Sequence, residues 1–291
     1  SQLVVPRLGN EVLNCYALAD KKKLKAVRQE TNYVINVSKV SQQNYATVIV
    51  IDIKGKPIIY DAPEIISPTG IFINQMPVYV KTKIPNAVIR YTLNGDEPIL
   101  SSPIAKDSIV IKESATVKAK CFLRDKPITE TSEASFDQVP PGRGTALSSP
   151  VQGLNYFVYE GDWSKLPDFD RLTSVSSGIS QGLDISSKRG KEKYGFAFSG
   201  LIRIPVEGVY NFFISSDDGS QLFIDDKLVI DNDGLHGSTE KNKEVALAAG
   251  FHAIKVLYFQ KTGGDDLLLQ WQGPGFKKTV IQASSFFREG Y

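Results

Sequence analysis

Two pairs of adjacent aspartates are the residues in this sequence whose types and spacing could do chemistry. Asp217-Asp218 precedes one glycine, and Asp265-Asp266 follows two. Neighbouring carboxylates repel each other unless a cation or a donor-rich ligand offsets the repulsion. Calcium takes about six to eight oxygen ligands, carboxylates and loop carbonyls among them. Three interpretations of Asp217-Asp218 are therefore open: a calcium site, a turn in which Asp217 caps backbone donors and Asp218 orders the chain, or direct contact with a sugar.

Two further residues are candidate sugar contacts. His236 lies in the Asp-, Asn- and Gly-rich loop 231–237, where it could line the same face or only form hydrogen bonds within its loop. Trp163 lies in a Gly-Asp-Trp turn, where its ring could stack on a sugar or pack against the domain. The candidate carbohydrate-binding residues are Asp217, Asp218, Asp265, Asp266, His236 and Trp163, with Asp217 and Asp218 as candidate calcium ligands.

Catalytic constellations are not recognisable in the sequence. Hydrolysis of a glycosidic bond needs two carboxyl groups about 5–10 Å apart in a cleft, whereas the aspartate pairs are sequence neighbours, and Asp225-Asp226 indicates only a hairpin turn. The two histidines, His236 and His252, lie near no G-x-S-x-G nucleophile motif. We therefore predict no catalytic residue in this chain.

The composition describes a long and nearly neutral chain. It has 291 residues with 34 basic and 32 acidic side chains, a formal net charge of +2. This balance does not favour a nucleic-acid partner, and no apolar run approaches the roughly 18 residues of a membrane span. The first residues lack the basic and apolar regions of a signal peptide and read as mid-domain sequence, so we expect a fragment of a longer protein. Two distant cysteines, Cys15 and Cys121, are expected to be buried free thiols.

Short strands must position the candidate residues. Alternating β-branched and aromatic runs bounded by Gly, Pro, Asn and Asp recur along the chain, and helical periodicity is nearly absent. The pattern predicts an all-β protein of tandem β-sandwiches. Pro and Gly at 61–63 and 139–144 divide the chain. The predicted parts are a fragmentary or small sandwich at 1–62, an immunoglobulin-like domain at 63–139 and a larger, jelly-roll-like sandwich at 145–291.

The middle segment contains a strand followed by a turn motif. Asn94-Gly95, a strong hairpin signal, ends the run Tyr91-Thr92-Leu93-Asn94-Gly95, and Glu97-Pro98 follows it. A later strand contains Thr116-Val117-Lys118-Ala119. These motifs resemble the small immunoglobulin-like domain appended to chitobiases and β-hexosaminidases. The resemblance implies a spacer and scaffold role for residues 63–139.

The first segment contains the run Asn32-Tyr33-Val34-Ile35-Asn36-Val37, followed by a second run, 44–57, which ends in Ile51-Asp52-Ile53-Lys54-Gly55-Lys56-Pro57. An apolar strand, an acidic residue, a glycine and a proline in this order resemble the closing strands of the C-terminal β-sandwich of bacterial α-L-fucosidases. That resemblance implies a catalytic domain upstream of Ser1, whose carboxylates would lie outside this chain.

The C-terminal segment carries the most complete order of motifs. It contains Gly153-Leu154-Asn155-Tyr156, Tyr210-Asn211-Phe212, Ser216-Asp217-Asp218-Gly219, Gly250-Phe251-His252 and Leu269-Gln270-Trp271. This order resembles the fourteen-kilodalton β-sandwich domain first named from anthrax protective antigen. The resemblance implies carbohydrate recognition, and in lectin-like members the matching acidic pair holds a calcium ion that binds sugar hydroxyls. The loop 261–266 lacks the asparagine that adhesins of the family use, so calcium stays one of the alternatives.

Taken together, the resemblances imply a non-catalytic, carbohydrate-binding accessory region of a secreted bacterial glycoside hydrolase that is α-L-fucosidase-like. The expected partners are glycans, fucosylated ones among them, and the protein's own upstream catalytic domain. The expected location is periplasmic or extracellular. Two alternatives are modules that only hold and shield a catalytic domain, and a calcium-dependent lectin like those of adhesins.

Overall fold

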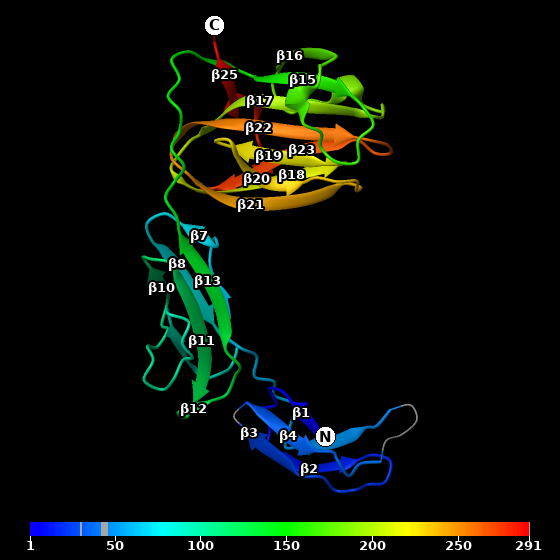
Figure 1. Ribbon diagram of the computed structural model, residues 1–291. Coiled ribbons are helices and arrows are strands. Elements are labelled where there is room, and N and C mark those ends of the chain that lie inside the picture. The colour runs from blue at the N-terminus through cyan, green and yellow to red at the C-terminus, as the bar shows by residue number, and fades with distance from the viewer. Residues whose placement is uncertain (30, 42–45, 291) are drawn as a thin grey trace. The chain divides into compact units, whose positions relative to one another are not determined.

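A computed structural model describes residues 1–29, 31–41 and 46–290 of the chain, and its regular elements are strands and short 3₁₀ turns (Figure 1). Tandem β-sandwiches are confirmed as the fold class. One compact unit comprises Ser1–Gly70 and Asn74–Asp137, and the other comprises Ile71–Ile73 and Gln138–Tyr291. The boundaries at residues 62, 139 and 145 stay predictions.

Segment 1–62 contains two small antiparallel sheets. One has the order β1-β4-β3, and the other pairs β2 with β5. Cys15 on β2 is buried and free, as is Cys121 in the middle segment, which confirms the prediction for both thiols. The strands are β1 (Gln2–Val5), β2 (Val12–Ala17), β3 (Ala26–Gln29), β4 (Asn32–Asn36) and β5 (Ile49–Ile53).

The middle segment has one sheet of order β10-β8-β6 and a second in which β11 pairs with β12, β13 and β9. Its strands are β6 (Glu64–Ile66), β7 (Ile71–Phe72), β8 (Met76–Lys81), β9 (Val88–Thr92), β10 (Ile109–Ile111), β11 (Ala115–Leu123), β12 (Lys126–Pro127) and β13 (Ser132–Gln138). The prediction that Asn94-Gly95 forms the turn of a hairpin is wrong, because the strand before it does not pair with the segment that follows. β9 pairs with β11, and Asn94-Gly95 begins a long loop before β10, because Gly95 N–H is held by the carbonyl of Thr116 on β11.

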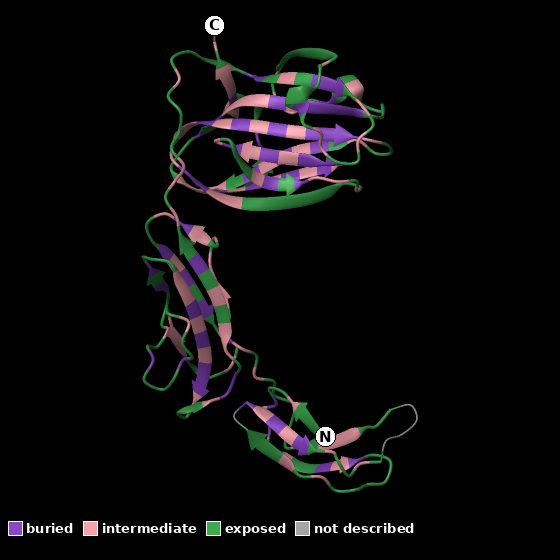
Figure 2. Cartoon of the chain, in the orientation of Figure 1, coloured by how far each residue is buried: buried purple, intermediate pink, exposed green. Residues whose placement is uncertain are grey.

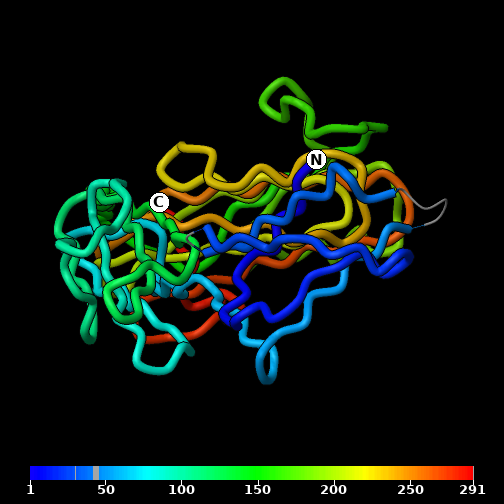
Figure 3. Tube along the Cα trace, turned by 90° about the horizontal axis from the view of Figure 1, so that it is seen from below, coloured from blue at the N-terminus to red at the C-terminus, as the bar shows by residue number. Residues whose placement is uncertain are grey.

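The C-terminal segment is a sandwich of two antiparallel sheets (Figure 1), and Figure 3 follows the course of the same chain along its Cα trace. The larger sheet has the order β14-β25-β17-β22-β19-β20, with β15 pairing β17 and β16 pairing β15; the smaller has the order β21-β18-β23-β24. The larger sheet contains β14 (Pro150–Gln152), β15 (Leu154–Glu160), β16 (Ser176–Ser180), β17 (Tyr194–Ile204), β19 (Ser220–Ile224), β20 (Lys227–Asn232), β22 (Gly250–Gln260) and β25 (Phe286–Glu289). The smaller contains β18 (Gly208–Asp217), β21 (Thr239–Leu247), β23 (Asp266–Gly273) and β24 (Phe276–Val280). Three 3₁₀ turns complete it: η1 (Phe169–Arg171), η2 (Ser186–Lys188) and η3 (Ala283–Ser285).

The sandwich core follows from strand alternation. Along β17, β18 and β22, alternate side chains are buried, and Figure 2 shows this as bands. Aromatic rings fill the space between the sheets, with Phe196 and Phe198 stacked at 5.4 Å. Trp271 and Phe259 are both buried. Trp271 belongs to the hydrophobic core, whereas Phe259 lies on the other face of β22 from Ile254 and Val256, against the turn at Gly219. The alternating strand sequence predicts Phe213 and Phe223 as core residues as well, but they lie on outer faces, where lysine ammonium groups cover their rings at 4.1 and 4.7 Å.

Candidate functional site

The turn between β18 and β19 carries the acidic pair. β18 ends at Asp217 and β19 begins at Ser220, so Asp218 and Gly219 make the connection, and the peptide bond between the two aspartates is cis. In the register of β18 and β23, Asp217 lies opposite Asp266. Gly219 is required by space, because a Cβ atom there would lie 2.4 Å from the ring of Phe259. The turn is therefore packed tightly onto the end of the sandwich.

Asp218 ties two loops together through their main chains. The residue is only 6% exposed. Oδ1 accepts the backbone N–H of His236 at 3.1 Å, and Oδ2 accepts that of Lys261 at 2.9 Å. A buried carboxylate with charge-assisted bonds from backbone donors is a strong anchor. Asp218 therefore fixes loop 233–238 and loop 261–265 beside the turn.

Asp217 is the more accessible carboxylate of the pair. Burial, followed by the charge of Asp218, raises its pKa, while His236 and the backbone N–H of Ser238 offset part of that rise. Within the described residues, no lysine or arginine forms an ion pair with it. Gly264 keeps the approach to this group open, since a Cβ atom there would lie 2.8 Å from Asp217 Oδ2. Asp217 thus places a negative charge that is only partly compensated at an open position.

His236 is held within its own loop. Besides its backbone bond to Asp218, its ring Nδ1 lies 3.1 Å from the carbonyl oxygen of Gly237 and its Nε2 lies 2.9 Å from that of Asn232. Both ring nitrogens are therefore occupied locally. This geometry favours the loop hydrogen-bonding interpretation, although the residue remains beside Asp217.

The two aspartates of the neighbouring loop have different surroundings. Asp266 faces Asp217 across the strands, and its carboxylate accepts the hydroxyl of Ser238 at 3.2 Å. Asp265 instead accepts the backbone N–H of Gly190 at 2.6 Å. The structure thus brings Asp266 together with the acidic pair, whereas Asp265 anchors the loop that precedes β17.

Trp163 supports an adjacent loop. Its ring lies against Gly161, where a Cβ atom would come within 2.3 Å of it, and it meets Phe169 edge-on at 5.9 Å. The neighbouring Asp162 pairs with Lys193 at 2.8 Å and with Lys261 at 3.4 Å. The half-buried ring is therefore used mainly for packing, and its loop is joined to the loop that Asp218 holds.

The acidic turn offers calcium an incomplete set of ligands. Asp217 and Asp218 offer carboxylate oxygens, and Asp266 lies nearby. Within residues 1–29, 31–41 and 46–290, no group of three or more His, Cys, Asp or Glu side chains is arranged to hold a metal ion. Loop carbonyls or ligand hydroxyls would have to complete the shell. The donors present suit a hard cation that also contacts a ligand.

A buried polar layer lies beneath the turn, and its residues are not among those predicted from the sequence. The hydroxyl of Tyr258 donates to the carbonyl of Asp217 at 2.6 Å, and Gln260 Oε1 accepts the N–H of Asp218 at 2.9 Å. Burial raises the pKa of the neighbouring Tyr194 to about 12. The available signal was the glutamine at an inward position of β22, where alternation calls for an apolar side chain.

At the opposite end of the sandwich, the Asp225-Asp226 turn reverses the chain between β19 and β20 and also forms hydrogen bonds to β22. Asp225 Oδ2 lies 2.7 Å from Nδ1 of the fully buried His252, and its Oδ1 accepts the backbone N–H of Ala253 at 3.1 Å. Asp226 is exposed. The expectation of a plain hairpin turn is therefore corrected for Asp225.

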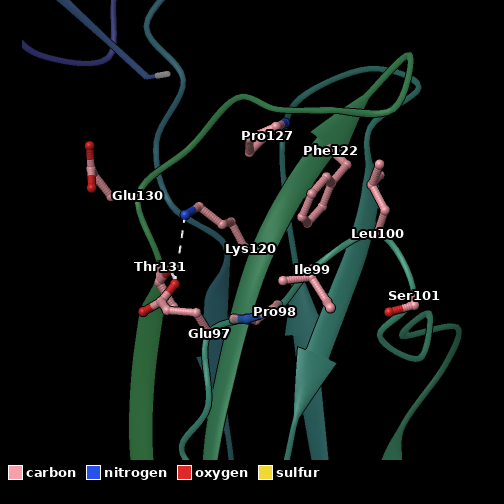
Figure 4. Close-up of a pocket in the computed structure, with 10 residues that line it drawn as sticks. All are labelled: Glu97, Pro98, Ile99, Leu100, Ser101, Lys120, Phe122, Pro127, Glu130 and Thr131. Carbon is pink, nitrogen blue, oxygen red and sulfur yellow. Dashed lines mark hydrogen bonds and ion pairs between the residues drawn. The ribbon is translucent and has the colours of Figure 1, made fainter. Parts of the chain in front are cut away.

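The middle segment has an open groove of about 970 Å³ (Figure 4). Lys120 Nζ lies 3.6 Å from Glu97 Oε2, and the hydroxyl of Thr131 donates to the same oxygen at 2.6 Å. The hydroxyl bond, together with Lys120 and Lys118, lowers the pKa of Glu97. The exposed side chains of Ile99 and Leu100 add apolar surface to the groove. This groove has no counterpart among the predicted sites.

Comparison with known proteins identifies two domains. Residues 151–285 match the PA14 domain, and residues 67–133 match the chitobiase/beta-hexosaminidase C-terminal domain. The C-terminal sandwich is therefore similar to PA14 domains, and the middle segment is similar to the C-terminal domain of chitobiases and β-hexosaminidases.

Individual relatives are distant. The anti-sigma-I factor RsgI3 of Acetivibrio thermocellus is 28% identical over 99 residues, which is 34% of this chain and 15% of that protein. The PA14 sugar-binding domain from an RTX adhesin superposes with a TM-score of 0.42 at 16% identity, covering 48% of this chain and 99% of the adhesin domain. A solved anti-sigma factor domain-containing protein gives a TM-score of 0.43 at 18% identity, covering 74% of this chain and 84% of its own. The chain thus spans less than a sixth of its curated relative.

Over the part of the chain that is described, no helix has the length and apolar character to cross a bilayer.

Proposed function

We propose that the PA14 domain binds glycans at the Asp217-Asp218 turn, with calcium bridging the carboxylates and the sugar hydroxyls. The observation that carries this proposal is the partly buried carboxylate of Asp217, which has no lysine or arginine partner among the described residues and whose pKa is raised by burial and by Asp218. Such a group is stabilised when a cation arrives. Asp218 holds the two flanking loops, and Asp266 adds negative charge from the facing strand.

We further propose that the chain is a non-catalytic accessory region of a periplasmic or extracellular glycoside hydrolase. The PA14 domain and the chitobiase/beta-hexosaminidase C-terminal domain support a carbohydrate context. The motif at residues 49–57, of which β5 is a part, supports an α-L-fucosidase-like parent with fucosylated glycans as ligands. The upstream catalytic domain would then be the chain's own partner.

A second candidate role is ligand recognition within a protein related to anti-sigma factors. The 28% identity to RsgI3 over 99 residues favours it. Hydrolysis of an aryl α-L-fucoside by the full-length protein would support the glycosidase parent. Binding of the full-length protein to a sigma factor, without that hydrolysis, would support the second role. In both cases the PA14 domain keeps the same proposed ligand class.

The test is binding to a glycan array with calcium and again with a chelator. We expect binding in calcium, loss of binding in chelator, and loss of binding in Asp217→Asn. Asp226→Asn is the matched control, because Asp226 also belongs to an adjacent aspartate pair but lies in the exposed turn between β19 and β20. Binding that survives both chelator and Asp217→Asn would refute the proposed site.

Thermal unfolding separates the proposal from a purely structural role. A ligand at 100 times its Kd stabilises the native state by about 2.7 kcal/mol, which raises Tm by roughly 5–10 °C for a domain of this size. A Tm that does not move in millimolar calcium, together with an empty glycan array, would favour modules that only hold and shield another domain.

A further inference from the structure

Two side chains of β22 hold the peptide unit that joins the aspartates. Tyr258 donates its hydroxyl to the carbonyl oxygen of Asp217 at 2.6 Å, and Gln260 Oε1 accepts the N–H of Asp218 at 2.9 Å. The same Oε1 lies 3.3 Å from the Tyr258 hydroxyl. Both β22 side chains are fully buried, at 0% exposure. The backbone between the two carboxylates is thus fixed from inside the core.

Gln260 is an unfavourable residue in a hydrophobic core. Its Nε2 is buried, and among the described residues it has no hydrogen-bond partner. A buried polar atom without a partner costs stability. The inward positions that precede it on β22, Ile254 and Val256, are apolar and belong to the hydrophobic core. The requirement that Gln260 meets is therefore the N–H of Asp218.

The same layer reaches toward the second loop of the site. The rings of Tyr258 and Tyr194 pack edge-on, with centroids 6.1 Å apart. The hydroxyl of Tyr194 also lies 3.5 Å from Asp265 Oδ2, the oxygen that holds the N–H of Gly190. Buried side chains thus connect the acidic turn with loop 261–266 from below.

We propose that Tyr258 and Gln260 are positioning residues of the acidic site. By holding the carbonyl of Asp217 and the N–H of Asp218, they set the directions in which the two carboxylates leave the backbone. Groups that orient metal or ligand contacts in this way change affinity by roughly 10–100-fold when they are removed. The inference rests on the proposed function, since it concerns the same turn.

The test measures affinity for calcium alone by isothermal titration calorimetry in Gln260→Met and Tyr258→Phe. The matched control is Tyr210→Phe, because Tyr210 is equally buried and donates its hydroxyl to a backbone carbonyl, that of Val206, at 2.8 Å, away from the turn. We expect roughly 10–100-fold weaker binding in the two test variants and unchanged binding in the control. Equal affinities in all three variants would overturn the inference.

Stability gives a second readout. Gln260→Met removes the unpartnered Nε2 while it frees the N–H of Asp218, so its Tm should stay within roughly 4 °C of the parent. Weaker calcium binding at preserved Tm supports positioning. A large fall in Tm with unchanged calcium affinity indicates a structural role and contradicts the inference.

Amide exchange in calcium-free protein separates this inference from the proposed function. The N–H groups of Asp218, His236 and Lys261 are bonded to Gln260 or to the Asp218 carboxylate. We expect all three to exchange faster in Gln260→Met and to be unchanged in Tyr210→Phe. If the parent protein binds neither calcium nor glycan, the proposed function fails, while protection that is unchanged in Gln260→Met refutes the positioning inference independently.

Discussion

Replacing Asp225 by alanine should destabilise the PA14 domain far more than replacing Asp226. Both residues have positive φ, 49° and 60°, so alanine pays the same kind of backbone cost at either position. Only Asp225 carries bonds to the core, one with Nδ1 of His252 and one from the N–H of Ala253. The difference between the two variants therefore isolates those bonds.

The magnitude follows from the groups that lose a partner. An orphaned buried donor costs about 1–3 kcal/mol, and Asp225→Ala leaves two, the backbone N–H of Ala253 and the ring of His252, which is 0% exposed. We expect a difference of about 3 kcal/mol in the free energy of unfolding, a large part of the 5–15 kcal/mol, roughly, that stabilises a domain.

Tryptophan fluorescence during urea unfolding measures this difference in the intact chain. Both tryptophans, Trp163 and Trp271, belong to the PA14 domain, so the signal reports that domain alone. With a slope of about 1–3 kcal/mol per molar urea, the midpoint of Asp225→Ala should lie about 1–3 M below that of Asp226→Ala. Equal midpoints would show that the bonds to His252 and Ala253 contribute nothing net, and the reasoning would be wrong.

Two other changes have equally specific outcomes. Thr131→Val removes the hydroxyl bond that contributes most to the lowered pKa of Glu97, so this pKa should rise toward its ordinary value in an NMR titration. A lowered carboxyl pKa stabilises the folded state at pH values above the unfolded pKa, and this stabilisation is lost as the pH falls through the folded pKa. The stabilisation from Glu97 should therefore be lost at a higher pH in Thr131→Val than in the parent protein. An NMR titration of Glu97 that does not move would contradict this prediction. Gly264→Ala should weaken calcium binding in calorimetry at nearly unchanged Tm, since its Cβ would meet Asp217 Oδ2 at 2.8 Å, whereas Gly182→Ala, with open space around it, should not; equal affinities would count against Asp217 as a ligand.

Local patterns predicted the strands well, because burial of alternate residues is written directly into the sequence. The same patterns failed where a side chain faces outward but is covered by a long polar neighbour. Phe213 reads as a core residue, yet Lys278 from β24 lies over its ring on the outer face. The pairing of β9 with β11 likewise depends on a strand more than twenty residues away. Such non-local partners are not encoded in the local run.

The acidic pair could be found from the sequence, but the sequence did not show which carboxylate binds the loop N–H groups and which stays accessible. The sequence suggested that Asp217 caps backbone donors and Asp218 orders the turn. In the structure Asp218 accepts N–H groups from His236 and Lys261, and Asp217 is the accessible group. This exchange depends on two loops meeting beside one turn, which the strand order of both sheets decides. Gln260 was missed for the same reason, since its partner, the N–H of Asp218, is 42 residues away.

The bonds of Asp218 to the two loops have a consequence for variation among such domains. Both donors are backbone N–H groups, which every residue except proline supplies, so the identities of His236 and Lys261 are irrelevant to the anchor itself. Side chains in either loop can then change without loosening the loop from the turn. A descendant of this domain could acquire a new ligand preference by loop substitutions alone while inheriting its acidic centre intact.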